Sequence, residues 1–393
     1  MLIRRCAVLF VEPREDLDID WSALFAGEGA LGATVRWIAL APHLGAEIEI
    51  GADDMQALGH ISLTLWQERA ACEKKSSPEV IARLLELGLL ISDAPEGAAI
   101  RERDDVLRSQ HWRPLSATAH MFSRWGDMRV DKGMQFPSFE ELVESYGAPP
   151  APVVERRPDS RVGGSDDAPE SAALMLPAPE HSGLDDTLFK RYTGRNFDAA
   201  ATLPLATAAR LLQRAFGSQG EREMAPDAFV LKKLSPSAGG LHPTEAYVLA
   251  QRVEGVAPGL YHYHPVRHAL EPLAAMDTTQ TAELAMRMVA DQDWFVDAPL
   301  MVVLAARVER NFWKYRNHAK AYRALLLDAG HLSQTFYLMA TEAGMPAFVT
   351  AAVNEIDIER AFGLDPLKDM VVAVCGCGPA SGAQDTVEMR YEP

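Results

Sequence analysis

Lys314 and Tyr315 stand side by side where a charged segment runs into a long, largely apolar stretch of the chain. Lysine and tyrosine side chains take part in acid–base chemistry at neutral pH only where a pocket desolvates one of them or where the ammonium group stabilises the phenolate. Adjacent residues of a helix point about 100° apart, so a shared site requires the pair to lie at a helix end or a bend. We therefore expect the pair at the mouth of the helix that follows it. The simpler alternative is a lysine that extends into solvent beside a half-buried tyrosine.

The segment RYTGRNF places Arg191, Thr193 and Arg195 at alternate positions. In an extended conformation alternate side chains share one face, so two guanidinium groups and a hydroxyl group could converge on one anion. Guanidinium groups match the geometry of phosphate oxygens, and a threonine hydroxyl adds an uncharged donor. The motif indicates a phosphate site, with a solvated surface turn as the alternative.

A loop rich in proline and glycine, LSPSAGGLHPTEAYVLAQ, spans residues 234–251. Gly239 and Gly240 let the backbone approach a flat ligand closely, and their free N–H groups could bond to ring oxygens or nitrogens. The loop lacks both the GxGxxG spacing of a dinucleotide-binding fold and the GxxxxGK[ST] spacing of a P-loop. We therefore expect a ligand that is held mainly by loops.

Three histidines, His262, His264 and His268, lie close together in the segment PGLYHYHPVRHAL, residues 258–270. The segment is typical of an exposed β-hairpin around a Pro-Val-Arg turn. No acidic or thiol ligand stands at metal-binding spacing within it. We therefore predict no metal site.

The overall composition is that of a globular protein. The chain has 393 residues, of which 48% are hydrophobic and 24% charged, and a formal net charge of -17. That negative charge argues against unspecific binding to nucleic acid or to an anionic membrane, because both require a positive surface. The apolar run near the N-terminus has six residues, too short for a signal-peptide core or a membrane span. We expect a cytoplasmic protein.

The four cysteines, Cys6, Cys72, Cys375 and Cys377, are too few and too scattered for a disulfide framework and lack the paired CxxC spacing of a zinc site. This usage is typical of a reducing compartment. In the segment CGCGP we expect Cys375 and Cys377 to point to opposite faces of the last apolar strand and to serve as small buried residues.

Residues 148–183 divide the chain into two regions. Proline, glycine, serine and charged residues replace any apolar period there, which indicates a linker or a long mobile loop. We therefore predict an N-terminal region at 1–147 and a C-terminal domain at 184–393, both of ordinary domain size.

The N-terminal region contains a predicted strand at 5–11 and a helix that begins at Pro78, with Ser77 as its N-cap and Gly88 as its C-cap. A second predicted strand, at 89–92, follows at once. This order is typical of the end of a winged-helix module. The helix carries two glutamates and one arginine, which disfavours DNA and favours a peptide as its partner. A small structural domain without any partner is the alternative.

The C-terminal domain combines helices and strands. Apolar periodicity predicts helices at 203–216 and 321–343, and the second is apolar nearly all round, as expected for a helix buried inside a domain or across a dimer interface. Strands are predicted at 246–251, 259–263, 298–306 and 370–375. The continuous apolar run APLMVVLAA belongs in the middle of a sheet that is covered on both faces. Together these elements indicate an α+β or α/β core.

In chain order, these motifs resemble the flavin-dependent nitroreductase superfamily and, more narrowly, its SagB/McbC-type branch, the azoline dehydrogenases of ribosomal peptide maturation. The motifs are RYTGRNF, PSAGGLHPTEAYV, PGLYHYHP, FWKYRNHAKAYRALLLDAGHLSQTFYLMATEAGM and the closing VVAVCGCGPA, within residues 187–380. No single motif is diagnostic, whereas five in register are. The segment DDVLRSQHWRPLSATAHMFSRW, residues 104–125, is also similar to the stretch that precedes the flavin domain in that branch.

The resemblance implies an α+β fold, in which a nitroreductase-like mixed sheet flanked by helices follows a small winged-helix-like N-terminal domain. It also implies FMN, bound at the interface of a homodimer. The residues that it assigns to the cofactor are Arg191, Tyr192, Thr193, Arg195 and Arg390 around the phosphate, and Pro236, Ser237, Ala238, Gly239 and Gly240 along the isoalloxazine. A threonine stands where the family more often has serine, and it keeps the hydroxyl group.

The same resemblance implies the chemistry. Tyr315 would remove the Cα proton of a thiazoline or oxazoline while hydride passes from Cβ to the flavin, and Lys314 would favour the phenolate form of Tyr315. The product is an aromatic azole. The N-terminal region resembles leader-peptide recognition modules, which bind an extended leader as an added strand, and a cyclase is a possible further partner.

Two other functions remain open. An NAD(P)H-dependent reductase of nitro, quinone or dehydroamino acid groups would use the same cofactor with the opposite flow of electrons. A non-catalytic subunit that presents a precursor peptide to a cyclase would need no acid–base pair.

Overall fold

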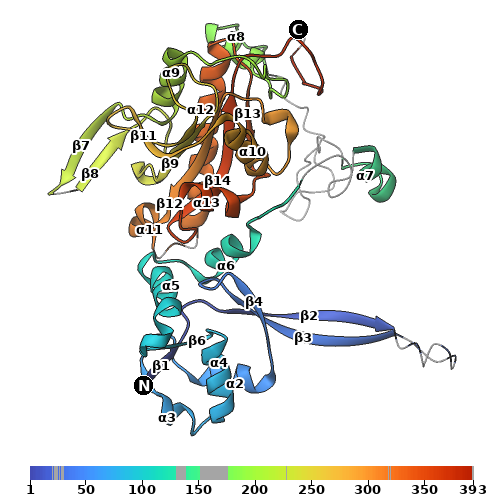
Figure 1. Cartoon of the computed structure of the whole chain (residues 1–393), viewed down its shortest axis with the longest axis vertical. Helices are drawn as coiled ribbons and strands as arrows, with labels where there is room; N and C mark the ends of the chain where they lie inside the picture. Colours follow the sequence, from blue (N-terminus) through green and yellow to red (C-terminus); the bar gives the residue numbers. More distant parts are fainter. Residues whose placement is uncertain are drawn as a thin grey trace, which may run out of the picture.

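The computed structural model describes residues 1–19, 21, 25, 27, 31–129, 139–150, 176–226, 228–316, 318 and 320–391. These residues form a smaller body that contains the N-terminus and a larger body that contains the C-terminal end (Figure 1). Of the expected linker, residues 151–175 lie outside the described residues, and the helix α8 (Gly183–Lys190) begins at its end. The domain boundaries at 147 and 184 stay a prediction.

A six-stranded sheet forms the centre of the larger body. Its strands, in the order in which they pair, are β11 (Ala269–Ala275), β10 (Gly259–His264), β9 (Thr244–Ala250), β12 (Leu300–Arg307), β14 (Asp369–Cys377) and β13 (Ala347–Thr350). Neighbouring strands are antiparallel, and single parallel bridges join Thr193 to Ala347 and Leu203 to Val253. The four predicted strands and the predicted hairpin are confirmed.

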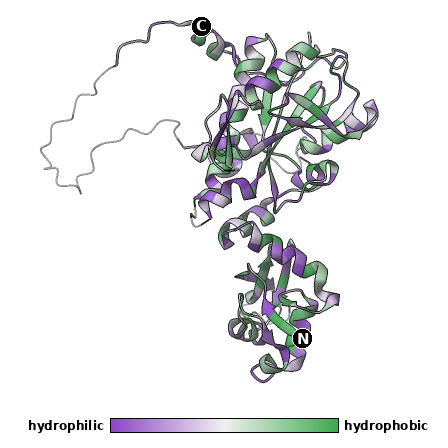
Figure 2. Cartoon of the chain, turned by 90° about the vertical axis from the view of Figure 1, so that its left-hand side faces the viewer, coloured by the Kyte–Doolittle hydropathy of each residue, from purple (hydrophilic) through white to green (hydrophobic). Residues whose placement is uncertain are grey.

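Helices cover both faces of this sheet. On one face, α9 (Leu205–Phe216) and α12 (Ala321–Glu342) share a core with β9, β12 and β14. On the other face lie α10 (Thr278–Met288), α13 (Glu355–Phe362) and the turn η4 (Asp293–Phe295). Strand β12 lies in the middle of the sheet, and seven of its eight residues are buried, as its continuous apolar run predicts. In Figure 2 the surrounding helices carry both apolar and polar residues, as expected for elements with one face on the core.

Two sequence predictions for the larger body are wrong. Lys314 and Tyr315 do not open the long helix, because they end a separate helix, α11 (Val308–Tyr315), and α12 begins at Ala321. Cys375 and Cys377 lie in the same buried cluster, because side chains alternate along a strand and residues two apart share a face. Burial raises the pKa of both thiols, in keeping with small core residues.

The long helix α12 buries one face against the sheet and leaves the other exposed. Leu326 and Leu327 are 43% and 65% exposed on this outer face. The inner face is therefore buried inside the domain as expected, and burial of the outer face across a dimer interface stays a prediction. The first predicted helix is confirmed, although it begins at Leu205 and Leu203 forms a bridge instead.

The smaller body contains two antiparallel sheets. One has the strand order β5 (Gln67–Glu68), β1 (Leu2–Arg5) and β6 (Leu90–Ser92). The other has the order β2 (Phe10–Ile19), β3 (Leu31–Ala41) and β4 (Ala46–Ile50). The helices α2 (Ala52–His60), α3 (Arg69–Cys72) and α4 (Pro78–Glu86) accompany them. The α+β class is confirmed, with a separate N-terminal region, and the winged-helix likeness of that region stays a prediction.

Helix α4 begins as the sequence predicts. The hydroxyl oxygen of Ser77 accepts the N–H of Val80 at 3.3 Å, and Gly88 follows the helix with a φ of 73°. The predicted strand at 5–11 is wrong in its extent, because β1 ends at Arg5 and β2 begins at Phe10. The apolar run there crosses from one sheet to the other.

The helices α5 (Ala98–Ser109) and α6 (Pro114–Ser123) join the two bodies. Trp112, between them, donates its indole N–H to the Leu367 carbonyl at 2.9 Å and shares a buried cluster with Phe312 of α11. Arg124 pairs with Glu359 at 2.5 Å, and both side chains are almost completely buried. This segment therefore packs the smaller body against the helix that ends in the lysine–tyrosine pair.

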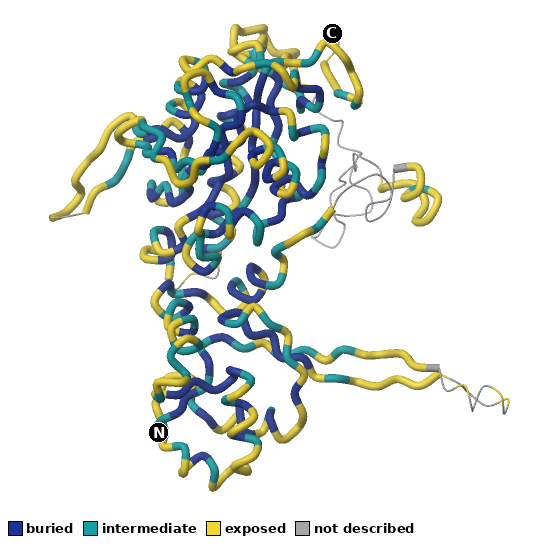
Figure 3. Tube along the Cα trace, viewed as in Figure 1, coloured by how far each residue is buried: buried dark blue, intermediate teal, exposed yellow. Residues whose placement is uncertain are grey.

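Two hairpins project from the molecule and are largely exposed (Figure 3). One consists of β2 and β3, and the other of β7 (Gly220–Ala225) and β8 (Ala228–Lys232). The remaining elements are α7 (Phe139–Tyr146) and the turns η1 (Pro95–Gly97) and η3 (Ala238–Gly240). No helix in the described part of the chain is long and apolar enough to cross a membrane.

Candidate functional site

Lys314 and Tyr315 meet the proline–glycine loop that the sequence assigns to a flat ligand. Helix α11 ends at Tyr315, so the pair lies at a helix end, as a shared site requires. Lys314 Nζ donates to the Gly239 carbonyl at 3.4 Å. A Cβ atom added to Gly239 would lie 2.5 Å from the Tyr315 hydroxyl oxygen and 2.8 Å from Lys314 Nζ. The pair and the loop therefore share one site, although Lys314 and Gly239 are 75 residues apart in the sequence.

The proline–glycine loop is held in place by Asp328 of α12. This carboxylate is 3% exposed and accepts the Ser237 hydroxyl at 2.5 Å and the Ala238 N–H at 3.0 Å. Gly239 and Gly240 have φ values of 62° and 68°, a region that glycine enters without strain. Asp328 is not among the residues predicted from the sequence, although an acidic residue in the middle of an apolar helix was an available signal.

Buried polar side chains line a small cavity behind this loop, and they too are absent from the sequence predictions. Lys233 is 4% exposed, and no hydrogen bond or ion pair joins its side chain to the described residues. Thr244 Oγ1 is also buried without a hydrogen-bond partner in that part of the chain. Burial lowers the pKa of Lys233 to about 8 and that of His242 to about 4. The cavity thus combines a cation of unusually low basicity with a neutral imidazole.

The RYTGRNF motif divides its side chains between two partners. The Arg191 guanidinium lies 5.3 Å from the centroid of the Tyr337 ring, and Thr193 Oγ1 lies 3.0 Å from the Tyr337 hydroxyl. Arg195 instead donates from its guanidinium to the Val387 carbonyl at 3.4 Å. Neither guanidinium pairs with a carboxylate among the residues that the structure describes. Arg191 and Thr193 therefore converge, whereas Arg195 contacts the C-terminal segment.

Arg390 lies against the same motif but already has an ionic partner. Its guanidinium is 4.3 Å from the centroid of the Tyr192 ring and 2.7 Å from a carboxylate oxygen of Glu388. The other oxygen of Glu388 accepts the backbone N–H groups of Arg195 and Asn196 at 2.7 and 3.0 Å. Burial raises the pKa of Glu388, but these donors and Arg390 outweigh it, so the net pKa is lowered. The role of Arg390 at a phosphate stays a prediction.

A cavity of about 550 Å³ opens beside these residues. Tyr192 and Arg390 line it together with Lys190 of α8 and the turn that follows α12. Its lining combines the basic side chains of Lys190 and Arg390 with the carboxylate of Asp186. Of the residues predicted to surround the phosphate, Tyr192 and Arg390 thus border this cavity.

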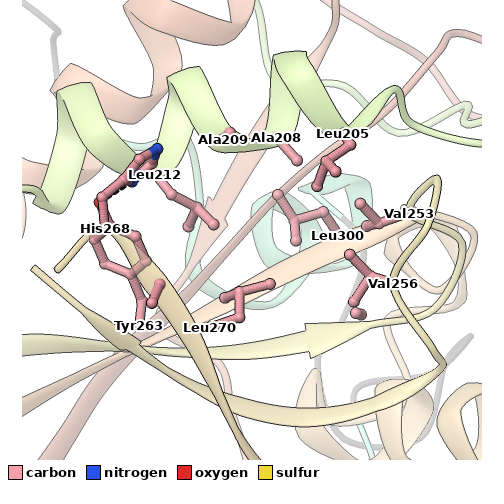
Figure 4. A pocket seen from close by; sticks show the side chains of 12 residues that line it. Leu205, Ala208, Ala209, Leu212, Val253, Val256, Tyr263, His268, Leu270 and Leu300 are labelled. Carbon is pink, nitrogen blue, oxygen red and sulfur yellow. Dashed lines mark hydrogen bonds between the residues drawn. The ribbon is translucent and has the colours of Figure 1, made fainter.

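A second cavity, of about 260 Å³, lies between α9 and the β10–β11 hairpin (Figure 4). Its lining is apolar except for Tyr263 and His268, whose hydroxyl oxygen and Nδ1 are 2.8 Å apart. Because these two groups are bonded to one another, the lining leaves few polar groups to orient a substrate. None of the predicted site residues lines this cavity.

The hairpin histidine His262 lies between two carboxylates. Its Nδ1 is 2.7 Å from Glu271 and its Nε2 is 3.2 Å from Glu245. His262 therefore has acidic partners, contrary to the expectation from its own segment, because they come from the adjacent strands β11 and β9. Among the described residues, no group of three or more histidine, cysteine, aspartate or glutamate side chains could hold a metal ion.

Comparison with known proteins gives a family match to the larger body. The model of the nitroreductase family matches residues 188–378. The chain is 31% identical over 191 residues to the protein named "Putative nitroreductase MJ1384" of Methanocaldococcus jannaschii, a match that covers 49% of this chain and 89% of that protein.

Two peptide-processing proteins are also similar. The chain is 29% identical over 178 residues to the microcin B17-processing protein McbC of Escherichia coli, which covers 44% of this chain and 61% of that protein. It is 29% identical over 137 residues to the trifolitoxin-processing protein TfxB of Rhizobium leguminosarum bv. trifolii, which covers 35% of this chain and 36% of that protein. The chain thus spans less than two thirds of the length of these two relatives.

The range that matches the family model contains the complete six-stranded sheet, the RYTGRNF motif, the proline–glycine loop and the lysine–tyrosine pair. Nearly the whole length of the archaeal relative is matched as well. The chain therefore belongs to the nitroreductase family, within its SagB/McbC-type branch.

Proposed function

We propose that this protein is an FMN-dependent oxidoreductase that dehydrogenates a ribosomally made peptide and converts an azoline ring into an azole. The observation that carries the proposal is the contact of Gly239 with Lys314 and Tyr315, because it joins the loop assigned to the cofactor with the groups assigned to acid–base chemistry. The similarity to McbC and TfxB, whose names describe the processing of microcin B17 and trifolitoxin, supports a peptide as the substrate.

The residues present fit FMN. Arg191 has no carboxylate partner within the described residues and converges with the Thr193 hydroxyl group, so this pair suits a phosphate, whereas Arg195 would have to turn from the C-terminal segment to join it. Gly239 and Gly240 have no Cβ atoms where the chain takes positive φ, so a flat ring can approach the backbone. Lys233 adds a buried cation behind the same loop. When bound, FMN supplies the two-electron acceptor of the oxidation.

Tyr315 is the proposed base. Its ring packs beside the buried cluster that contains Phe312 and Trp112, while its hydroxyl group faces Gly239. A substrate carbon placed over the loop can therefore lose its Cα proton to the Tyr315 oxygen. Lys314 Nζ lies 5.6 Å from the centroid of the Tyr315 ring, so a positive charge stands beside the proposed base.

A homodimer and a bound leader peptide are part of the proposal. Leu326 and Leu327 on the outer face of α12 offer apolar surface that a second copy would cover. In the N-terminal region, β4 and β6 are edge strands, to which an extended leader could add as a further strand. A cyclase that forms the azoline is the further partner proposed.

The first test is the visible absorbance spectrum of the purified full chain, with mass spectrometry of the released chromophore. We expect a flavin spectrum and the mass of FMN. A preparation that stays colourless after incubation with FMN would refute the cofactor and, with it, the proposed function.

The second test concerns the base. After anaerobic mixing with an azoline-containing peptide, the flavin absorbance should bleach, and Tyr315→Phe should slow this bleaching by about 10² to 10⁴-fold while keeping the flavin. Tyr322→Phe is the matched control, because it removes a hydroxyl group from the same aromatic cluster and should bleach at the normal rate. Normal flavin bleaching and azole formation by Tyr315→Phe would contradict the assigned base. If Tyr315→Phe supports normal peptide maturation and the flavin does not bleach, a non-catalytic presenting subunit is favoured.

The second candidate function is an NAD(P)H-dependent reductase of nitro, quinone or dehydroamino acid groups. The match to almost the full length of a protein named as a nitroreductase favours it. Anaerobic mixing separates the two functions. Bleaching by NADPH and not by the azoline peptide would select the reductase, and the reverse result would select the dehydrogenase.

A further inference from the structure

A cavity of about 340 Å³ lies where the smaller body meets the end of α11. Its larger apolar side chains are Val8, Leu63, Leu107 and Trp112. Its basic side chains are Arg108, His111, Arg113 and Arg316. None of the described residues that line it is acidic, although the chain as a whole has a net charge of -17. The cavity is therefore a basic and apolar site on an acidic protein.

Two of its arginines carry charge that no carboxylate compensates. Arg108 is bound by Asp104 at 2.8 Å, so its charge is neutralised. Arg113 and Arg316 are exposed, and neither forms an ion pair with any residue that the structure describes. Arg316 donates to the backbone carbonyl of Trp313 at 3.0 Å, which leaves its positive charge in place. The two guanidinium groups are thus available to a carboxylate ligand.

The cavity is adjacent to the lysine–tyrosine pair. Arg316 directly follows Tyr315 in the chain. Trp112 packs edge-on against Phe312 of the same helix, with ring centroids 5.1 Å apart, and Tyr315 packs beside the same cluster. A ligand in the cavity would therefore touch the end of α11, whose Tyr315 hydroxyl faces the Gly239 loop.

We propose that this cavity binds a segment of the peptide substrate in which acidic and apolar residues alternate, and so holds the peptide between the N-terminal region and the acid–base pair. The inference rests on the function proposed above. In an extended segment, alternate side chains point to opposite sides, so carboxylates can face Arg113 and Arg316 while apolar side chains face Trp112. A phosphate-bearing nucleotide is the competing ligand, and the test below distinguishes it from the peptide.

The test uses the full chain and a fluorescein-labelled peptide of sequence Glu-Leu-Glu-Leu-Glu-Leu, with binding followed by fluorescence anisotropy. Arg113→Glu replaces an exposed attraction by a repulsion of similar size, so we expect about tenfold weaker binding. Arg287→Glu is the matched control, because Arg287 is exposed on α10, has no ion pair within the described residues and lies outside the cavity. Both variants change the net charge by the same amount, and the control should bind normally.

A charge-swapped peptide guards against misfolding. Lys-Leu-Lys-Leu-Lys-Leu should bind more tightly to Arg113→Glu than to Arg287→Glu, which a damaged fold cannot produce. Undetectable binding of the acidic peptide, or equal losses in both variants, would overturn the proposal. Displacement of the acidic peptide by NADPH or inorganic phosphate would also overturn it and indicate a phosphate site. If the protein binds FMN but does not bind the acidic peptide as expected, only the peptide site is disproved. If it binds the peptide as expected but takes up no FMN, the proposed function is disproved.

Discussion

Replacing Gly239 by alanine should disable Lys314 and Tyr315 without unfolding the protein, and Gly240→Ala is the matched control. Both glycines have positive φ, at 62° and 68°, where an alanine costs about 1–2 kcal/mol. A Cβ at Gly239 would lie 2.5 Å from the Tyr315 hydroxyl oxygen and 2.8 Å from Lys314 Nζ. A Cβ at Gly240 would meet no atom within 4 Å. The two variants therefore share the same backbone strain and differ in the contact with the pair.

The size of the effect follows from these distances. The three atoms nearest to the new Cβ at Gly239 all belong to the flexible side chains of Tyr315 and Lys314, so we expect these side chains to move and the fold to be kept. Ordinary contact begins at 3.4 Å, so the Tyr315 hydroxyl must shift by about 1 Å. A displacement of about 1 Å can cost on the order of 10²-fold in rate. We expect both variants to lose about 1–2 kcal/mol of unfolding free energy and Gly239→Ala alone to lose about 10²-fold in rate.

The assay compares the two variants in three measurements. Urea denaturation gives the free energy of unfolding, flavin fluorescence gives the affinity for FMN, and anaerobic stopped-flow absorbance gives the rate at which an azoline peptide bleaches the bound flavin. Equal bleaching rates in Gly239→Ala and Gly240→Ala would refute the contact as a feature of the acid–base site. A much lower stability of Gly239→Ala would show that the neighbouring groups are rigid, contrary to the reasoning above.

Three further predictions concern charged residues. Arg124→Ala should lower the unfolding free energy by about 3–5 kcal/mol above pH 7, because Glu359 loses the partner of its buried charge. Burial raises the pKa of Glu359 to about 7, so this loss in urea denaturation should shrink as the pH falls through 7, where Glu359 takes up a proton in the folded parent. The exposed pair broken by Arg210→Ala should cost no more than about 1 kcal/mol. Burial lowers the pKa of Lys233 from 10.5 to about 8, so the folded state loses stability as the pH falls through this window. Flavin-free Lys233→Met should therefore be about 3 kcal/mol more stable than the parent below pH 8, and no more stable than the parent above pH 10.5. A gain in stability that does not vary with pH would contradict a buried charge at Lys233. Arg191→Met should weaken FMN binding by about 10 to 100-fold in fluorescence titration and leave riboflavin binding unchanged, whereas equal losses for both ligands would exclude a phosphate contact.

Much of the fold of the larger body was predictable, because the pattern of apolar residues within each segment indicates which of its faces is buried. The apolar run of β12 indicates a strand covered on both faces, and the stripe that ends at Phe216 indicates one buried face of α9. Predictions failed where an apolar pattern continues across a boundary. The pattern after Tyr315 hides the break between α11 and α12, and the run at 5–11 passes from one sheet into the next.

The candidate site was predictable only in part. Residue types and local motifs named the lysine–tyrosine pair, the proline–glycine loop and the arginine motif, because their chemistry is visible in a short segment. Lys233 and Asp328 were missed, since a lysine before a loop and an aspartate in a helix become informative only when they are buried. Arg195 was grouped with Arg191, but the chain turns its side chain toward the C-terminal segment.

The order of residues alone specifies which side chains are able to do chemistry here, which segments form strands or helices, and which face of each is apolar. It does not specify that Gly239 lies against Tyr315, or that Asp328 bonds to Ser237, 91 residues away. Those contacts depend on the strand order of the sheet and on how α11 and α12 pack beside it. Local patterns reflect backbone preference and burial within a few turns, whereas a contact between distant segments exists only after the whole chain has closed around its core.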